Sequence, residues 1–333
     1  MTIKNLVAPP TGAEVDRWAD TVVAAHTADL PGVPAPSRLE IAGRLRVPPA
    51  RGRAALWTAD GGAGVAALLL FTEEANRTTA YLDVLAVHPD ARRRGTGTAL
   101  WRTVREELLA DGRTSVATTL DLGGPGQAFA QSLGFENVLP MAWYVQDLPR
   151  DPAAADAAEA AAPVPPGYAL LSWHGLVSDD WAGAVAAAHG AMQDAPAGDV
   201  DVQIEAWTPQ VLHAAHRLIL DRGGELTTVA AVTEAGEVAA YTELVLPDPD
   251  GVRALQYDTV VVPAHRGRGL GRAVKAHMQA LTARRHPRLR QIATTVADEN
   301  IPMRAVNEAL GYRRERGTAY FQLTLDGAAG PRP

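Results

Sequence analysis

The sequence contains no cysteine, which excludes disulfide scaffolds, thiolate zinc sites and cysteine nucleophiles. No apolar stretch approaches the ~20 residues of a membrane span, because the run from Val65 to Phe71 is only as long as a strand. Residues 1–12 show no basic region followed by an apolar run. We therefore expect no signal peptide, no membrane partner and a cytoplasmic protein.

Basic residues are outnumbered, with 31 Lys and Arg against 38 Asp and Glu and a net charge of −7. This balance argues against a nucleic-acid partner and favours a small cationic one. Nothing in the composition separates a monomer from a homodimer, and both remain open.

Several familiar motifs are missing as well. The phosphate loop G-x-x-x-x-G-K-[ST] occurs nowhere, and no serine lies in G-x-S-x-G. The dinucleotide pattern G-x-G-x-x-G would need glycine where Leu100 and Arg272 stand. His213 and His216 share one face of a predicted helix but have no third ligand, so we expect no metal site.

The length of 333 residues favours two domains. The segment Asp151–Gly167 consists of alanine, proline and acidic residues with nothing large to bury, which is typical of a linker. We predict an N-terminal domain over residues 1–150, a linker over 151–166 and a C-terminal domain over 167–333.

The two halves repeat the same order of motifs. In the first half a hydrophobic strand precedes RRRGTG at Arg92–Gly97, and in the second a similar strand precedes RGRGLG at Arg266–Gly271. Leu133-Gly134-Phe135 then follows in the first half and Leu310-Gly311-Tyr312 in the second. Shared order at nearly shared spacing indicates an internal duplication.

Each half is predicted to be an α/β unit in which helices precede an antiparallel meander that leads into the glycine loop. The predicted helices are 14–28, 98–110, 181–192, 207–220, 272–285 and 301–310, and the predicted strands are 54–58, 65–72, 79–87, 226–233, 237–246, 252–262, 291–296 and 318–325.

The glycine loops are suited to an anion. Backbone N–H groups at a helix start lack intrahelical partners and lie at the positive end of the helix dipole, so they favour a pyrophosphate. Glycine allows close approach of the backbone, and the neighbouring arginines supply charge that phosphate oxygens attract.

Both loops, with the strand ends and the Leu-Gly-aromatic segments, resemble the motifs of the GNAT superfamily of acetyl-coenzyme A dependent N-acetyltransferases. The resemblance covers both halves and implies two tandem GNAT-fold domains. Each would be an α/β domain with a mixed, mostly antiparallel sheet, flanking helices and a splayed strand pair. It also implies acetyl-coenzyme A as co-substrate, with the pantetheine arm between the splayed strands. The coenzyme-binding residues carried over by position are Ala86, Val87, Arg92, Arg93, Arg94, Gly95, Thr96, Gly97 and Thr98 in the first half, and Val260, Val261, Val262, Arg266, Gly267, Arg268, Gly269, Leu270, Gly271, Arg272 and Asn300 in the second.

The family often places a tyrosine four residues before the second-motif glycine, to meet the leaving thiolate. Asn307 stands there in the second half and Ala130 in the first. Asparagine can donate a hydrogen bond to sulfur and alanine cannot, so we expect catalysis in the second half and a degenerate or binding-only first half. Tyr312 and Tyr320 are alternative acids.

The base that deprotonates the acceptor is left among several carboxylates. Glu243 and Asp258 are candidates in the second half, with Tyr257 beside them on the opposite face of the strand unless a bulge inverts the alternation. Asp83 is the candidate in the first half, and Asp194 and Asp199 would attract a cationic amine.

The sequence therefore predicts direct transfer of an acetyl group from the coenzyme thioester to a primary amine of a small molecule. Two alternatives remain open: a non-catalytic acyl-coenzyme A sensor or scaffold, and an O-acyl or longer-acyl transferase on the same fold.

Overall fold

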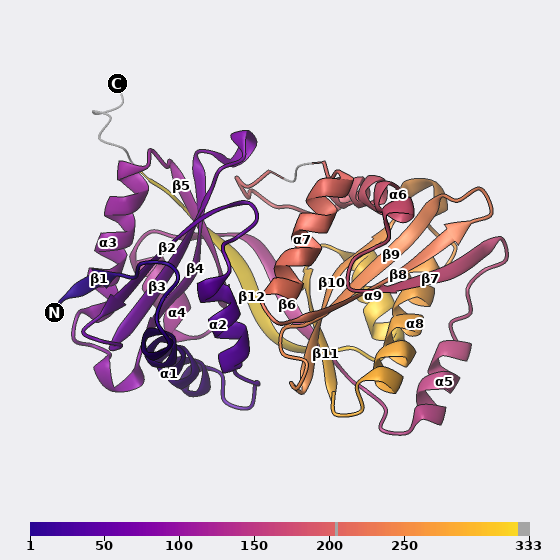
Figure 1. The fold of residues 1–333 in the computed structure, drawn as a ribbon, viewed down its shortest axis with the longest axis horizontal. Helices are drawn as coiled ribbons and strands as arrows, with labels where there is room; N and C mark the ends of the chain where they lie inside the picture. Colours follow the sequence, from indigo (N-terminus) through magenta and orange to yellow (C-terminus); the bar gives the residue numbers. More distant parts are fainter. Residues whose placement is uncertain (204–205, 326–333) are drawn as a thin grey trace. The chain divides into compact units, whose positions relative to one another are not determined.

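The computed structural model describes residues 1–203 and 206–325, so residues 326–333 of the predicted second domain lie outside it. The chain divides into two compact units (Figure 1). The first unit contains residues 1–140, 197–203 and those from Gly317 on, and the second contains residues 141–196 and the described residues up to Arg316. No helix among the described residues has the length and apolar character to cross a bilayer.

The sheet of the first unit ends in a splayed parallel pair. Its strands follow the order β1 (Ile3–Asn5), β2 (Gly52–Ala59), β3 (Gly64–Phe71), β4 (Thr79–Val87), β5 (Ser115–Asp121) and the last part of β12 (Arg313–Thr324). Strands β4 and β5 run parallel but pair only over Thr79–Tyr81 and Ser115–Ala117. Beyond these residues the two strands separate.

Helices cover both faces of this sheet. Trp18 of α1 (Gly12–Asp29) and Ile41 of α2 (Arg38–Arg46) pack on one face. Leu100 of α3 (Thr96–Ala110) and Ala130 of α4 (Pro125–Ser132) pack on the other. Helix α1 begins with a capping box, because Thr11 and Glu14 exchange hydrogen bonds.

The second unit repeats the arrangement. Its strands follow the order β6 (Glu136–Asp147, from Met141), β11 (Gln291–Ala297), β10 (Arg253–Val261), β9 (Val238–Leu246), β8 (Glu225–Thr233) and β7 (Tyr168–His174). Parallel pairing of β10 with β11 stops after Leu255 and Ala293. Every residue of β9 is buried, because helices cover both faces of this sheet.

The helices define two faces, named here for the second unit. Helices α6 (Asp179–His189) and α7 (Pro209–Asp221) cover the α6/α7 face, where Tyr241 and Val260 are buried. Helices α8 (Leu270–Arg285) and α9 (Ile301–Ala309) cover the α8/α9 face, where Leu244 and Tyr312 are buried.

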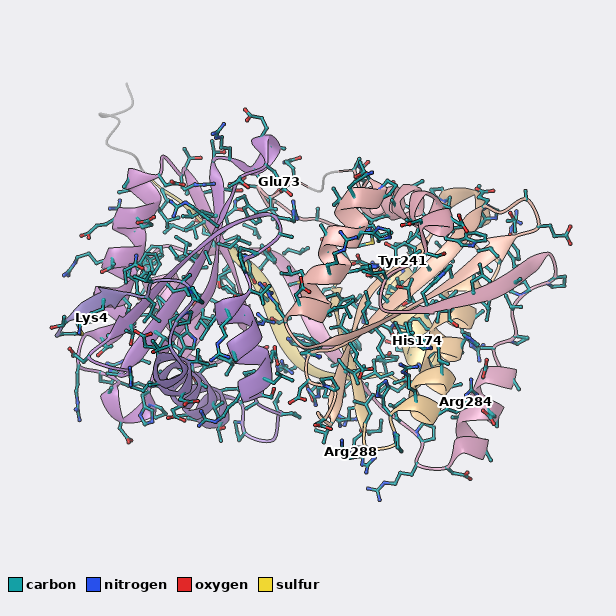
Figure 2. All side chains as sticks on the ribbon, in the orientation of Figure 1. Lys4, Glu73, His174, Tyr241, Arg284 and Arg288 are labelled. Carbon is teal, nitrogen blue, oxygen red and sulfur yellow. The ribbon has the colours of Figure 1, made fainter. Side chains whose placement is uncertain are left out.

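The predicted linker contains a helix, α5 (Pro152–Ala160), which lies beside α8 (Figure 1). Asp151 caps it, since its carboxylate accepts the Ala153 N–H. Asp156 and Arg284 form an ion pair at 2.6 Å, and Glu159 accepts from His277 (Arg284 is labelled in Figure 2). This part of the segment therefore packs on the second unit.

Each unit is completed by a strand that is distant in sequence. The end of β12 pairs with β5, in a register that places Thr318 opposite Asp121 and Thr324 opposite Ser115. The end of β6 pairs with β11, with Met141 opposite Ala297 and Asp147 opposite Gln291. The compact units are for this reason not contiguous in sequence, and domain boundaries at residues 150 and 167 stay a prediction.

Candidate functional site

The two glycine loops have the same backbone conformation. Gly95 and Gly269 are the N-caps of α3 and α8, with φ angles of 85° and 81°. Side chains other than glycine adopt this left-handed conformation only at a cost. It directs the first N–H groups of each helix toward one point beyond the helix start, where an anion is favoured.

In the first unit a cavity of about 810 Å³ opens where β4 and β5 separate. Its lining includes Ala86 and Val87 of β4, Thr96 at the helix start, and Trp101 and Phe135. The rings of Trp101 and Phe135 meet edge to face, 5.3 Å between centroids. A cavity of this size, with a mostly apolar lining and a helix start in its wall, is typical of a site for a small molecule or coenzyme.

Two loop arginines that we expected to reach phosphates are already engaged. Arg92 donates to the Val87 carbonyl oxygen (3.1 Å) and forms a bidentate pair with Asp29 at 2.6 and 2.8 Å. Arg266 repeats this with the Val261 carbonyl oxygen (3.1 Å) and Asp194 (2.7 Å). Both side chains brace the end of the central strand.

Other predicted loop residues divide by role. Arg93 and Gly267 share one position and a positive φ, 62° and 75°. Arg268 donates to the Tyr168 hydroxyl at 2.7 Å. A Cβ on Gly271 would lie 3.4 Å from Val261, so the loop packs closely on the strand end.

Most of the remaining predicted coenzyme residues lie in the two loops or in the first turns of α3 and α8. Arg94, Gly97 and Thr98 are in the first loop and its helix, and Leu270, Gly271 and Arg272 begin α8. The Val262 N–H donates to the Ala239 carbonyl oxygen at 2.9 Å, so it is not a free donor. Asn300 caps α9, accepting the Met303 N–H at 3.2 Å.

A bulge in β10 brings two candidate bases together. Gln256 pairs with Leu244 and Thr259 with Thr242, so Tyr257 and Asp258 together lie opposite Glu243. Tyr257 is 44% exposed. The Asp258 carboxylate lies 3.5 Å from His189 on the α6/α7 face, with 31% of the side chain exposed.

Glu243 is held by a histidine that sequence reasoning did not connect with it. His216 of α7 contacts the Glu243 carboxylate through Nε2 at 2.7 Å, and both side chains are nearly inaccessible to solvent. Among the described residues, Nδ1 of His216 has no hydrogen-bond partner. With its proton on Nε2 the ring donates to the Glu243 carboxylate, so that an acceptor and not a buried N–H is left unpaired.

The electrostatics favour Asp258 as a base near neutral pH. Close packing around its carboxyl, with the nearby charge of Glu243, raises the pKa of Asp258 to about 7. The Tyr241 hydroxyl lies 2.7 Å from Nδ1 of His189, whose ring stacks on Trp207 at 3.7 Å (Tyr241 is labelled in Figure 2). A carboxyl with such a pKa, still reached by solvent, is suited to take a proton from an ammonium.

The predicted acids lie on the opposite face. Asn307 is fully buried, and within the part of the chain that the structure describes neither its amide nitrogen nor its amide oxygen has a partner. Tyr312 is buried with its hydroxyl 3.3 Å from Oε1 of Gln256, and burial raises its pKa. Lys275 lies 4.6 Å above the Tyr312 ring, and the sequence analysis missed it. Its sequence signal is its place four residues after Gly271, where the first half has Trp101 four residues after Gly97.

Two expected placements are wrong, and a third residue has a partner that the sequence did not indicate. Tyr320 belongs to the first unit, where it pairs with Thr119 and lies near Tyr81, because β12 completes that sheet. Asp199 also lies in the first unit, with its N–H on the Val138 carbonyl. Asp194 is the partner of Arg266, which makes it part of a brace.

The candidate base of the first unit lies in a comparable bulge. Asp83 is left out of the register between β3 and β4. Its carboxylate is 3.4 Å from Arg44 of α2. Among residues 1–203 and 206–325, no three His, Asp or Glu side chains gather in a way that would hold a metal ion.

Two family models match the chain. An acetyltransferase (GNAT) domain model matches residues 52–137, and an acetyltransferase (GNAT) family model matches residues 200–312. Each match contains one glycine loop with the strands before it. A comparison with curated proteins finds no significant match.

Solved structures agree with this assignment. The chain is similar to a tandem GNAT protein from the clavulanic acid biosynthesis pathway, with 29% identity, full coverage of both chains and a TM-score of 0.80. It shares the fold of a GCN5-related N-acetyltransferase from Sphaerobacter thermophilus, with 16% identity, 97% and 95% coverage and a TM-score of 0.67.

Proposed function

Because the chain belongs to the GNAT superfamily of acyltransferases, with two such domains in tandem, we propose that it transfers an acetyl group from acetyl-coenzyme A to a primary amine of a small molecule. The observation that carries this proposal is the bulge of β10, which combines a carboxyl poised near neutral pH with the splayed strand pair of the same unit.

The coenzyme would be held by the residues around the splayed strands and the helix starts. In the first unit the 810 Å³ cavity receives the pantetheine arm, and the helix start at Thr96 receives the pyrophosphate. The left-handed conformation of Gly95 and Gly269 keeps backbone donors available in both units. When bound, the coenzyme supplies the acyl group as an activated thioester.

Asp258 would take the proton that the acceptor ammonium must lose before it attacks. An alkylammonium has a pKa near 10, so a base close by is needed at neutral pH. His216 contacts the Glu243 carboxylate, and the charge of Glu243 raises the pKa of Asp258. Glu243 thereby sets the pKa of the base, whereas Asp258, which solvent reaches, takes the proton.

The acceptor is proposed to be a small cationic amine that attacks the thioester directly in a ternary complex. Two carboxylates at the bulge attract such a group, and the net charge of −7 favours its approach. The similar tandem protein comes from the biosynthesis of a small molecule, which supports an acceptor of that size.

The test is release of free coenzyme A thiol from acetyl-coenzyme A, followed for the full chain across a panel of primary amines. We expect release that depends on the amine and that disappears in Asp258→Asn. The matched control is Asp83→Asn in the first unit, which should keep most of the activity. Thiol release with alcohols but with no amine would point to O-acyl transfer.

A second function, coenzyme binding without catalysis, is favoured for the first unit alone. Val84 stands there eight residues before Arg92, as Asp258 stands before Arg266. Asp83 forms an ion pair with Arg44 at 3.4 Å. Two results together would support binding without catalysis in the first unit: acetyl-coenzyme A binds saturably to its cavity, and changes in that cavity leave turnover unaffected.

A further inference from the structure

Three equivalent positions beside the splayed strands carry side chains of different polarity in the two units. In the first unit Trp101, Ala130 and Phe135 line the cavity. In the second unit the equivalent positions, counted from Gly271 and Gly311, hold Lys275, Asn307 and Tyr312. The second unit therefore carries an ammonium and an amide at positions where the first unit carries apolar groups.

Lys275 lacks the partner that a buried charge requires. Its side chain is 1% exposed, and among the described residues it forms no ion pair and no hydrogen bond. Its contact is the face of the Tyr312 ring, at 4.6 Å. An uncompensated buried ammonium costs several kcal/mol, so burial alone lowers the pKa of Lys275 to about 7.

Asn307 adds a second unsatisfied group in the same layer. Its amide is fully buried and both polar atoms lack partners, although its carbonyl oxygen of the main chain accepts the Tyr312 N–H at 3.0 Å. Buried polar groups without partners are rare in folded proteins, and each needs an explanation. Lys275 and Asn307 both adjoin Tyr312, so one ligand group can explain both.

We propose that Lys275 and Asn307 form an anion-binding subsite beside the splayed strands β10 and β11, which takes a carboxylate at the end of the acyl chain that coenzyme A carries. This carboxylate accepts hydrogen bonds from the Lys275 ammonium and the Asn307 amide and neutralises the buried charge. The proposal rests on the proposed coenzyme binding and extends it to the acyl group.

The experiment is calorimetric titration of the full chain with four ligands: succinyl-coenzyme A, acetyl-coenzyme A, coenzyme A and desulfo-coenzyme A. We expect the succinyl form to bind about tenfold more tightly than the acetyl form, the scale of one charge-assisted hydrogen bond. This preference should vanish in Lys275→Met. A preference for coenzyme A over the desulfo form, with none for the succinyl form, would overturn the proposal, because the bound anion would then be the leaving thiolate.

The matched control is Trp101→Met, which changes the equivalent position of the first unit and carries no charge. It should leave the preference for the anionic ligand unchanged. Titrations in two buffers of different ionisation enthalpy should also reveal proton uptake on binding near pH 7.5, absent in Lys275→Met. This readout reports the charge of Lys275 and not its volume.

Three further results would overturn the proposal: no preference for the succinyl form over the acetyl form, a preference that survives Lys275→Met and Lys275→Gln, or a lower melting temperature of the free Lys275→Met variant. The last would mean that the ammonium is already stabilised without a ligand. These measurements need no acceptor and no turnover, so failure of the proposed acetyl transfer would leave them informative.

Discussion

The two units share the backbone geometry of their glycine loops and differ in the side chains at the bulges of their central strands. Gly95 and Gly269 have the same φ to within a few degrees, and Arg92 and Arg266 brace the same carbonyl position. The bulge of β10, by contrast, carries Asp258 beside His189, where Asp83 of the first unit faces Arg44. A duplicated scaffold can thus keep one backbone geometry in both copies while the side chains at the two bulges diverge.

The largest expected effect is at Asp258. Asp258→Asn should lower amine-dependent thiol release by roughly 10²–10⁴-fold, the usual contribution of a general base. In the unchanged chain the rate should rise with pH up to about 7 and then level off, because the carboxyl must lose its proton to act. An equal loss in Asp83→Asn would contradict the assignment of catalysis to the second unit alone.

The charge of Lys275 should make stability depend on pH. Its pKa is lowered to about 7 in the folded chain, against an ordinary value near 10.5, so the unfolded chain binds more protons between these values. Stability should therefore rise with pH from about 7 to 10, by at most ~4 kcal/mol. Denaturant titrations of Lys275→Met should lack this rise, whereas Trp101→Met should retain it.

The loop glycines test whether both clefts bind coenzyme. Gly95→Val and Gly269→Val each force a β-branched residue into the left-handed region, at ~1–2 kcal/mol. We expect each to weaken acetyl-coenzyme A binding in its own unit by about tenfold. Calorimetry that shows a loss in one variant only would assign the coenzyme to that unit.

Positions 130 and 307 are equivalent in the two units, and adding an amide at the first should affect stability more than removing it from the second. Ala130→Asn buries an amide among apolar groups of the first unit and should destabilise it by ~1–3 kcal/mol. Asn307→Ala removes an amide that already lacks partners, so we expect a stability change below ~1 kcal/mol. Thermal melting of both variants measures the difference, and equal losses would mean that Asn307 is satisfied in the free protein.

The smallest effect concerns the two braces. Arg92 and Asp29 are both about 30% exposed and paired in bidentate fashion, while Arg266 and Asp194 are about half exposed. Arg92→Ala should therefore lower the free energy of unfolding by ~1–2 kcal/mol and Arg266→Ala by less than ~1 kcal/mol. Chemical denaturation followed with a separate probe in each unit measures both losses in the free energy of unfolding. A larger loss in Arg266→Ala than in Arg92→Ala would show that Arg266 is the stronger brace.

The sequence predicts the local part of this structure well. Alternation and apolar periodicity place β4, β8 and β9 within a residue of their observed bounds, and the glycines mark the helix starts. The resemblance to the GNAT superfamily, carried by motifs a few residues long, is confirmed by the family models and the tandem neighbour.

Non-local contacts were beyond the sequence. The pairing of β12 with β5 depends on which edge is free after folding, and no local pattern encodes it. Asp29 lies far in sequence from Arg92, so the brace could not be distinguished from a phosphate contact. Lys275 reads as an ordinary helical lysine until the packing shows that it is buried.

The strand that completes the first unit has a consequence for the order of events during synthesis. Strand β5 leaves the ribosome long before Thr318, its neighbour's first paired residue opposite Asp121. At 5–20 residues per second the interval lasts roughly 10–40 s. Throughout that time one edge of β5 has unpaired backbone donors and acceptors, which invite pairing with other nascent chains. A slower translation of the second half would lengthen this exposure, so yield of native protein should depend on translation speed after residue 121.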